Sequence, residues 1–227
     1  MINIPAEHMQ LAKEIYPKCT SQLDQEIFAL AENNFKRGGY FVEFGATNGV
    51  ELSNTFLLEK EFGWSGICAE PGKVWHKELT KNRKCHIDYH CVWNVSGEKI
   101  SFHESELALL STASEYKTVA DANIKNRMAG KKYDVETITL EDLLNKYSAP
   151  KKIDYLSIDT EGSEYEIIKD FDFKSWDIQA ITIEHNYMPQ RKKIYDLLTS
   201  HGFNRVHIAN SKFDDWYTKR KSRFLYV

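Results

Sequence analysis

The sequence predicts an α/β fold built around a mainly parallel β-sheet. Short apolar segments recur along the 227 residues, and most are followed by a segment whose apolar positions have helical spacing. Strand–helix alternation of this kind is typical of parallel strands joined by right-handed crossovers. A chain of this length buries roughly 70–75% of its unfolded surface. We therefore expect one domain over residues 1–227.

The first part of the chain is expected to contain three strands. Residues 1–37 are predicted to form a helical segment that ends at Gly38 and Gly39, because glycine is favoured just past a helix C-terminus. The three strands are predicted at 40–45, 64–71 and 84–94, with a turn and helix at 46–63 and a helix at 72–83.

Residues 95–135 interrupt this alternation. A turn and an extra strand are predicted at 96–105, followed by a polar segment at 107–132 without clear periodicity. Long segments of this type inside a compact domain are usually functional or mobile. We expect a loop or partly helical lid here.

The alternation then returns until the C-terminus. Helices are predicted at 137–148, 164–171 and 191–202, with strands at 153–159 and 178–186. Residues 203–227 are expected to form an antiparallel hairpin, whose outer edge is a surface where a second copy could pair as a homodimer.

Composition excludes several classes of protein. The net charge of −3 lacks the basic bias of a nucleic-acid-binding protein, so no nucleic-acid partner is expected. No apolar run approaches the roughly 20 residues that span a bilayer, and the N-terminus has no signal-peptide pattern. The four cysteines lack disulfide or zinc spacing. We expect free thiols in a reducing compartment, and hence a soluble, cytoplasmic protein.

An acid and two glycines follow the first predicted strand, in the sequence "VEFGATNG". Glycines there allow a sharp turn and a close approach to a ligand. The pattern lacks the third glycine of the dinucleotide fingerprint. A carboxylate at Glu43 suits a ligand with positive charge, such as S-adenosylmethionine.

The second predicted strand ends in Glu70 and Pro71. An acid at this position commonly accepts hydrogen bonds from both hydroxyls of a ribose. With the glycine turn one unit earlier, it predicts a nucleoside cofactor. The full set of expected cofactor contacts is Glu43, Gly45, Thr47, Asn48, Gly49, Ser53, Glu70, Pro71, Cys91, Val92, Asp159, Thr160 and Glu161.

Two blocks of sequence carry a family resemblance. "YFVEFGATNGVELSNTFLLEKEFGWSGICAEP" and "IDYLSIDTEGSEYEII" resemble the FkbM family of S-adenosylmethionine-dependent methyltransferases, from about residue 38 to the C-terminus. The resemblance implies a class I methyltransferase (Rossmann-like) fold, a three-layer sandwich whose seven-stranded, mostly parallel sheet has an antiparallel last strand. It also implies O-methylation of a sugar hydroxyl in a glycan or nucleotide sugar, or of a small natural product. The family usually has Asp where this chain has Glu43.

Acidic residues follow the two later strands. Asp159 and Glu161 come after one strand, and Glu184 ends the next. Adjacent strands lie about 4.8 Å apart, so Asp159 and Glu184 are expected to meet. Carboxylates are ligands of hard cations, which makes Mg²⁺ at Asp159 and Glu184 a hypothesis.

Methyl transfer to a hydroxyl also needs a group that accepts the proton. The sequence offers His185, whose unperturbed pKa is near 6.5, and Asp159. Polar and aromatic side chains in the lid and at the strand ends are predicted to contact a small-molecule or glycan acceptor. They are Ser111, Ser114, Glu161, Asn186 and Tyr187.

Three other functions are compatible with parts of this pattern. A nicotinamide-dependent oxidoreductase would also bind a nucleoside, but the glycine spacing disfavours it. A nucleic-acid N-methyltransferase usually has an N-P-P-Y-like motif where this chain has "DTEG". A non-catalytic nucleoside-binding module is the third alternative, which the retained acid–glycine turn and Glu70 disfavour.

Overall fold

The computed structural model describes residues 2–105, 111–113 and 130–219. Within them, seven strands form a main sheet in the order β10-β11-β9-β8-β1-β2-β3. Their bounds are β1 Tyr40–Phe44, β2 Ser65–Ala69, β3 His86–Asp88, β8 Lys152–Ile158, β9 Asp177–Glu184, β10 Asn204–Val206 and β11 Asp214–Thr218.

Strand directions identify the type of sheet. β1 lies between β2 and β8 and pairs in parallel with both, whereas β11 is antiparallel to β9 and β10. This order and the antiparallel β11 are those of the class I methyltransferase fold, so the fold implied by the resemblance is confirmed. The predicted C-terminal hairpin is also confirmed in β10 and β11, with the short helix α9 (Ile208–Ser211) between them. Its last residues, 220–227, lie outside the described part of the chain.

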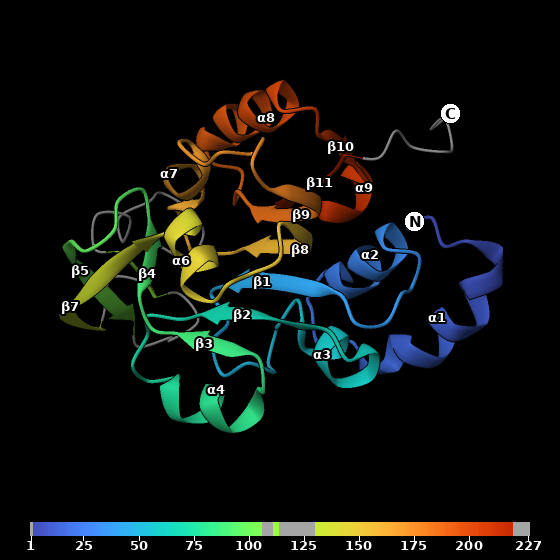
Figure 1. Cartoon of the computed structure of the whole chain (residues 1–227), viewed down its shortest axis with the longest axis horizontal. Helices are drawn as coiled ribbons and strands as arrows, with labels where there is room; N and C mark the ends of the chain where they lie inside the picture. Colours follow the sequence, from blue (N-terminus) through green and yellow to red (C-terminus); the bar gives the residue numbers. More distant parts are fainter. Residues whose placement is uncertain (1, 106–110, 114–129, 220–227) are drawn as a thin grey trace.

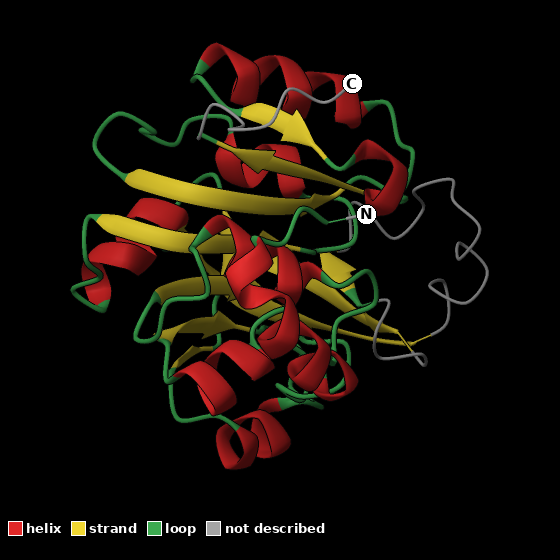
Figure 2. Ribbon diagram, turned by 90° about the vertical axis from the view of Figure 1, so that its right-hand side faces the viewer, coloured by secondary structure: helices red, strands yellow, loops and turns green. Residues whose placement is uncertain are grey.

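Helices cover both faces of the main sheet and make it a three-layer sandwich (Figures 1 and 2). One apolar cluster joins the sheet to α6, α7 and α8, and a second joins its other face to α1, α2 and α3. Successive side chains of a strand point to opposite faces, so Val42 belongs to the first cluster and Phe41 to the second. The helix bounds are α1 Met9–Ile15, α2 Gln25–Glu32, α3 Phe56–Phe62, α4 His76–Asn82, α6 Leu140–Lys146, α7 Glu164–Ile168 and α8 Gln190–Ser200, with 3₁₀ turns at Ala6–His8 and Tyr16–Lys18.

A second, four-stranded sheet lies beside the main one (Figure 1). Its order is β4-β7-β5-β6, with β4 Cys91–Trp93, β5 Lys99–Ser105, β6 Thr112–Ala113 and β7 Gly130–Thr139. The extra strand predicted within 96–105 is therefore β5. Residues 130–132, predicted as part of the lid, belong to β7, and residues 114–129 lie outside the described residues.

Two predicted boundaries were wrong. The single strand expected at 84–94 is two strands in different sheets, because the Asp88 carboxylate accepts the backbone N–H of His90 at 2.8 Å and turns the chain between β3 and β4. The helix expected from residue 137 begins at Leu140. Thr139 caps it by accepting the N–H of Asp142 at 3.1 Å, and the residues before it pair in β7.

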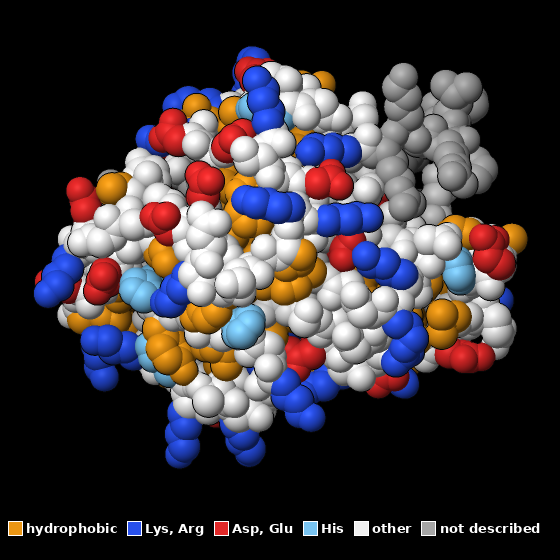
Figure 3. Space-filling model, in the orientation of Figure 1, with side chains coloured by type: hydrophobic (Ala, Val, Ile, Leu, Met, Phe, Trp, Pro, Cys, Tyr) orange, Lys and Arg blue, Asp and Glu red, His pale blue; other side chains and the backbone are white. Residues whose placement is uncertain are grey.

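Charged side chains of both signs are interspersed on the face seen in Figure 3. Among the described helices, none is both long enough and apolar enough to cross a bilayer.

Candidate active site

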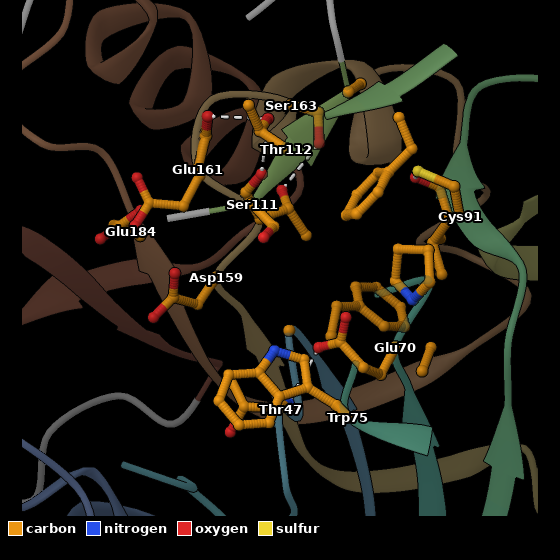
Figure 4. Close-up of a pocket in the computed structure, with 18 of the residues that line it drawn as sticks. Thr47, Glu70, Trp75, Cys91, Ser111, Thr112, Asp159, Glu161, Ser163 and Glu184 are labelled. Atoms are coloured by element: carbon orange, nitrogen blue, oxygen red, sulfur yellow. Dashed lines mark hydrogen bonds between the residues drawn. The ribbon is translucent and has the colours of Figure 1, made fainter. Parts of the chain in front are cut away.

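A cleft of about 280 Å³ lies at the carboxyl ends of the central strands. Ligands of open α/β sheets bind at this edge. Figure 4 shows Asp159, Glu161 and Glu184 on one side of the cleft, Glu70 and Cys91 on the other, and Trp75 at the bottom between Asp159 and Glu70. The lining consists of Gln22, Phe44, Gly45, Thr47, Leu52, Ala69, Glu70, Pro71, Trp75, His90, Cys91, Val92, Phe102, Ser111, Thr112, Ala113, Asp159, Thr160, Glu161, Ser163, Glu184, Asn186 and Phe213.

Gly45 makes the floor of the cleft possible. It follows β1 with φ = 74°, a conformation that favours glycine. A Cβ added there would lie 1.9 Å from the carbonyl oxygen of Asp159, at the end of the neighbouring strand β8. Only glycine lets these two strand ends pack so closely.

Glu70 lies at the end of β2, where the sequence predicts the ribose contact. Its carboxylate accepts the backbone N–H of Thr47 at 2.9 Å and that of Gly72 at 2.7 Å. Burial raises its pKa to about 7, although both N–H groups act in the opposite direction, and the charges of Glu104 and Glu43 add to the rise. Each carboxylate oxygen keeps a second lone pair, so two ribose hydroxyls can still donate to this group.

Apolar side chains line the cleft next to Glu70. Cys91 and Val92 are there, as predicted, together with Trp75 and Phe102. Flat apolar walls of this kind suit the ring of a nucleobase. A nucleoside with its ribose at Glu70 would place its base among them.

Three carboxylates face the opposite part of the cleft. β8 and β9 pair with Ile158 opposite Ile183, so the next residues along, Asp159 and Glu184, lie side by side. Glu161 joins them, and one carboxylate oxygen from each lies within 4.8 Å of the others. Burial raises the pKa of Asp159 well above its usual range, and repulsion by Glu161 adds to the rise. The pKa of Glu184 is raised by burial and by the charge of Asp159.

The loop that carries Glu161 is held by its neighbours. One Glu164 carboxylate oxygen accepts the backbone N–H groups of Thr160 at 3.1 Å and Gly162 at 2.9 Å. From the small sheet, the Thr112 hydroxyl donates to the carbonyl oxygens of Thr160 and Glu161 at 3.3 and 3.1 Å. Glu164 is thus structural, whereas Glu161 lines the cleft.

The predicted cofactor contact of Glu43 is not supported by its placement. Glu43 lies on the same face of β1 as Phe41, beneath α2 and α3, and its side chain is 2% exposed. Its carboxylate accepts the Thr55 hydroxyl at 2.7 Å and forms an ion pair with Arg83 at 3.3 Å. It does not line the cleft.

Three further residues of the predicted cofactor set position the loop after β1 and do not line the cleft. The Asn48 side chain accepts the N–H groups of Val50 and Glu51 at 2.9 and 2.8 Å. Gly49 accepts a hydrogen bond from Arg83 through its carbonyl oxygen, and the Ser53 hydroxyl donates to Glu43.

His185 also lies away from the cleft. Its Nε2 atom is 3.6 Å from Asp215 Oδ1, and its Nδ1 atom accepts the N–H of Tyr187 at 2.9 Å. The ring is on the opposite side of the chain from Glu184, because successive side chains alternate at the end of β9. The placement argues against the predicted role of His185 as the base and leaves Asp159.

The structure places some of the predicted acceptor contacts at the cleft and others away from it. Ser111, Glu161 and Asn186 line the cleft, and Ser114 lies outside the described residues. Tyr187 is 68% exposed and is not part of the lining.

Sequence reasoning missed several lining residues. Trp75 had a local signal, because it is an aromatic residue just after the Glu70-Pro71-Gly72 turn. Phe102 had none, since it reaches the cleft only through the pairing of β5 with β6 and β7.

Comparisons with known proteins identify the family of the chain. A family model described as the methyltransferase FkbM domain matches residues 43–205. No curated protein is significantly similar to the chain.

Two solved structures show similarity at low identity. An FkbM methyltransferase from Methylobacillus flagellatus KT is 11% identical, with a TM-score of 0.47, and the match covers 93% of this chain but 59% of that one. A chain of a fibrillarin/Nop5p complex is 10% identical, with a TM-score of 0.39, and the match covers 86% of this chain and 82% of that one. The family model spans most of the chain, including all but the first three residues of the two sequence blocks, and on that finding the protein belongs to the FkbM methyltransferase domain family.

Proposed function

We propose that this protein is an S-adenosylmethionine-dependent O-methyltransferase whose acceptor is a hydroxyl of a sugar, in a glycan or nucleotide sugar, or of a small natural product. The observation that carries the proposal is the cleft itself, with the Glu70 carboxylate at one end and three carboxylates at the other. The donor and the acceptor oxygen would meet between them.

The charge of the cleft supports a cationic donor. Four carboxyl groups line it, those of Glu70, Asp159, Glu161 and Glu184, and its described lining contains no lysine or arginine. Such a site attracts a sulfonium and disfavours the pyrophosphate of a dinucleotide. The nicotinamide-dependent alternative is therefore the weaker one.

Different residues of the cleft would bind the donor and accept the proton. When bound, S-adenosylmethionine supplies an electrophilic methyl group on a positively charged sulfur. Glu70 would fix the ribose, and the apolar wall around Trp75 would hold the base. The acceptor hydroxyl would then form its bond to the methyl carbon as the carbon–sulfur bond breaks, and Asp159 would accept the hydroxyl proton.

Calorimetry tests the donor class. S-adenosylhomocysteine is expected to bind the full chain with one-to-one stoichiometry, whereas NAD⁺ should give no heat. Transfer of a labelled methyl group to sugar-containing extracts then tests the enzyme against the non-catalytic alternative. Heat with NAD⁺ and none with S-adenosylhomocysteine would contradict the proposal.

Cofactor affinity is expected to depend on pH through Glu70. Its pKa of about 7 means that the carboxylate loses charge as the pH falls below 7. Hydroxyl groups donate more strongly to the ionised form, so affinity for S-adenosylhomocysteine should fall below pH 7 and level off above it. Glu70→Gln should weaken binding about 10- to 100-fold, since hydrogen bonds to charged groups contribute roughly 1.5–3 kcal/mol. Calorimetry at pH 6, 7 and 8 checks both, and an unchanged pH dependence in the variant would contradict the assignment.

A further inference from the structure

We propose that Asp159, Glu161 and Glu184 bind one divalent cation, with Glu161 completing the site, and that this cation binds the acceptor hydroxyl. The role of the cation in catalysis rests on the proposed function, whereas cation binding itself does not. The site lies at the ends of β8 and β9 and in the loop that follows β8.

The spacing of the three carboxylates suits a single ion. Oxygen ligands lie about 2.0–2.1 Å from Mg²⁺ and about 2.3–2.6 Å from Ca²⁺. Two oxygens on opposite sides of one ion are therefore about 4.0–5.2 Å apart. Oxygen atoms of Asp159, Glu161 and Glu184 lie within 4.8 Å of one another. The three side chains would therefore need to move little or not at all to coordinate one ion.

Glu184 gives an independent indication that a ligand is bound here. Its side chain lines the cleft and is 7% exposed, and its Oε2 atom has no hydrogen-bond partner among the described residues. A buried carboxylate oxygen without a partner is costly. The described cleft lining offers no lysine or arginine to compensate it. A cation shared with Asp159 and Glu161 would satisfy this oxygen and remove the repulsion among the three charges.

The surrounding contacts place Glu161 where it can act as the third ligand. Its backbone has φ = 58°, a left-handed conformation that is uncommon outside glycine, asparagine and aspartate. The Glu164 carboxylate and the Thr112 hydroxyl hold the backbone on both sides of it. Glu161 thus enters the cleft from a fixed loop, next to the strand-end carboxylates of Asp159 and Glu184.

A cation at this point would assist the reaction in two ways. Three carboxylates leave coordination positions of an octahedral ion open to water and to the acceptor oxygen. Coordination lowers the pKa of a bound hydroxyl, so its proton can pass to solvent or to a carboxylate oxygen. The oxygen would then attack the methyl group as the carbon–sulfur bond breaks, as described for the proposed function.

Direct binding of Mn²⁺ to the full chain tests the site. Titration followed by the electron paramagnetic resonance signal of free Mn²⁺ should show one bound ion per chain, displaced by Mg²⁺. Asp159→Asn, Glu161→Gln and Glu184→Gln should each weaken Mn²⁺ binding at least tenfold. Glu141→Gln, which changes an exposed acid on α6, should leave it unchanged.

Binding of S-adenosylhomocysteine to each variant shows that its cleft is still folded. Absence of Mn²⁺ binding to a wild-type chain that binds S-adenosylhomocysteine would overturn the cation site and leave the proposed function standing. Equal Mn²⁺ affinity in all three variants would also overturn it. Mn²⁺ binding without S-adenosylhomocysteine binding would support the site and contradict the proposed function.

Discussion

Replacing Asp159 by Asn is expected to make the protein more stable to heat and far less active. Asp159 lies beside Glu184 and Glu161, and its carboxyl loses hydration in the cleft, so its negative charge opposes folding. The amide has nearly the same shape and removes that charge. Loss of the group that accepts the proton should lower kcat by about 10²- to 10⁴-fold.

The gain in stability expected for Asp159→Asn follows from the raised pKa of Asp159. A carboxyl whose pKa is higher in the folded than in the unfolded protein stabilises the fold at low pH and loses that contribution as the pH rises. The melting temperature of the cation-free protein should therefore fall between pH 5 and pH 8, less steeply in Asp159→Asn. Each kcal/mol of unfolding free energy that the variant gains at pH 8 should raise its melting temperature by about 2–4 °C.

Differential scanning calorimetry without divalent cations measures this effect, with Asp170→Asn as a control. Asp170 is exposed and follows α7, outside the cleft. A lower melting temperature for Asp159→Asn would mean that the carboxylate stabilises the fold. Unchanged kcat would remove Asp159 from the reaction.

The carboxyl ends of the central strands were the most predictable part of the molecule. Asp159 and Glu184 end two apolar segments, and parallel pairing brings such residues to one edge of a sheet. Glu70 and Gly45 follow from the same rule, since each sits where its strand ends. Local sequence is sufficient in these cases because the position depends on the strand alone.

The sequence-based predictions failed for residues whose role depends on the face of the strand to which their side chain points. Glu43 precedes Phe44 and Gly45, and it belongs to the face packed under α2 and α3. His185 follows Glu184 and points to Asp215 for the same reason. The alternation of side chains was available in the sequence, but which face would hold the cleft depended on the pairing of distant strands.

The small sheet was the least predictable part. β5 pairs with β7, about thirty residues further along, and Glu104 and Tyr133 meet only through that pairing, at 2.7 Å. The Tyr133 hydroxyl accepts the N–H of Lys73 at 2.9 Å, and Thr112 reaches the Glu161 loop from β6. These contacts connect both sides of the cleft, yet no local pattern encodes them.

The second large effect is expected at Arg83, which no sequence motif singled out. Its side chain is fully buried and forms ion pairs with Glu59 at 2.8 Å and with Glu43 at 3.3 Å. It also donates to the Gly49 carbonyl oxygen at 3.2 Å and to the Thr55 hydroxyl at 2.8 Å. Arg83 therefore joins the end of α4 to the loop after β1, whose Gly45 and Thr47 line the cleft.

Arg83→Met is expected to lower the free energy of unfolding by about 3–5 kcal/mol, because it leaves two buried carboxylates without their cation. Urea unfolding at 25 °C measures the loss. Arg83→Lys should lie between wild type and Arg83→Met, since lysine keeps the charge but cannot make the forked contacts. Adding Glu43→Gln to Arg83→Met should recover part of the loss by removing one unpaired charge. A double variant no more stable than Arg83→Met would show that Glu43 serves another purpose than pairing with Arg83. In that case the cofactor contact predicted for Glu43 would need to be tested again.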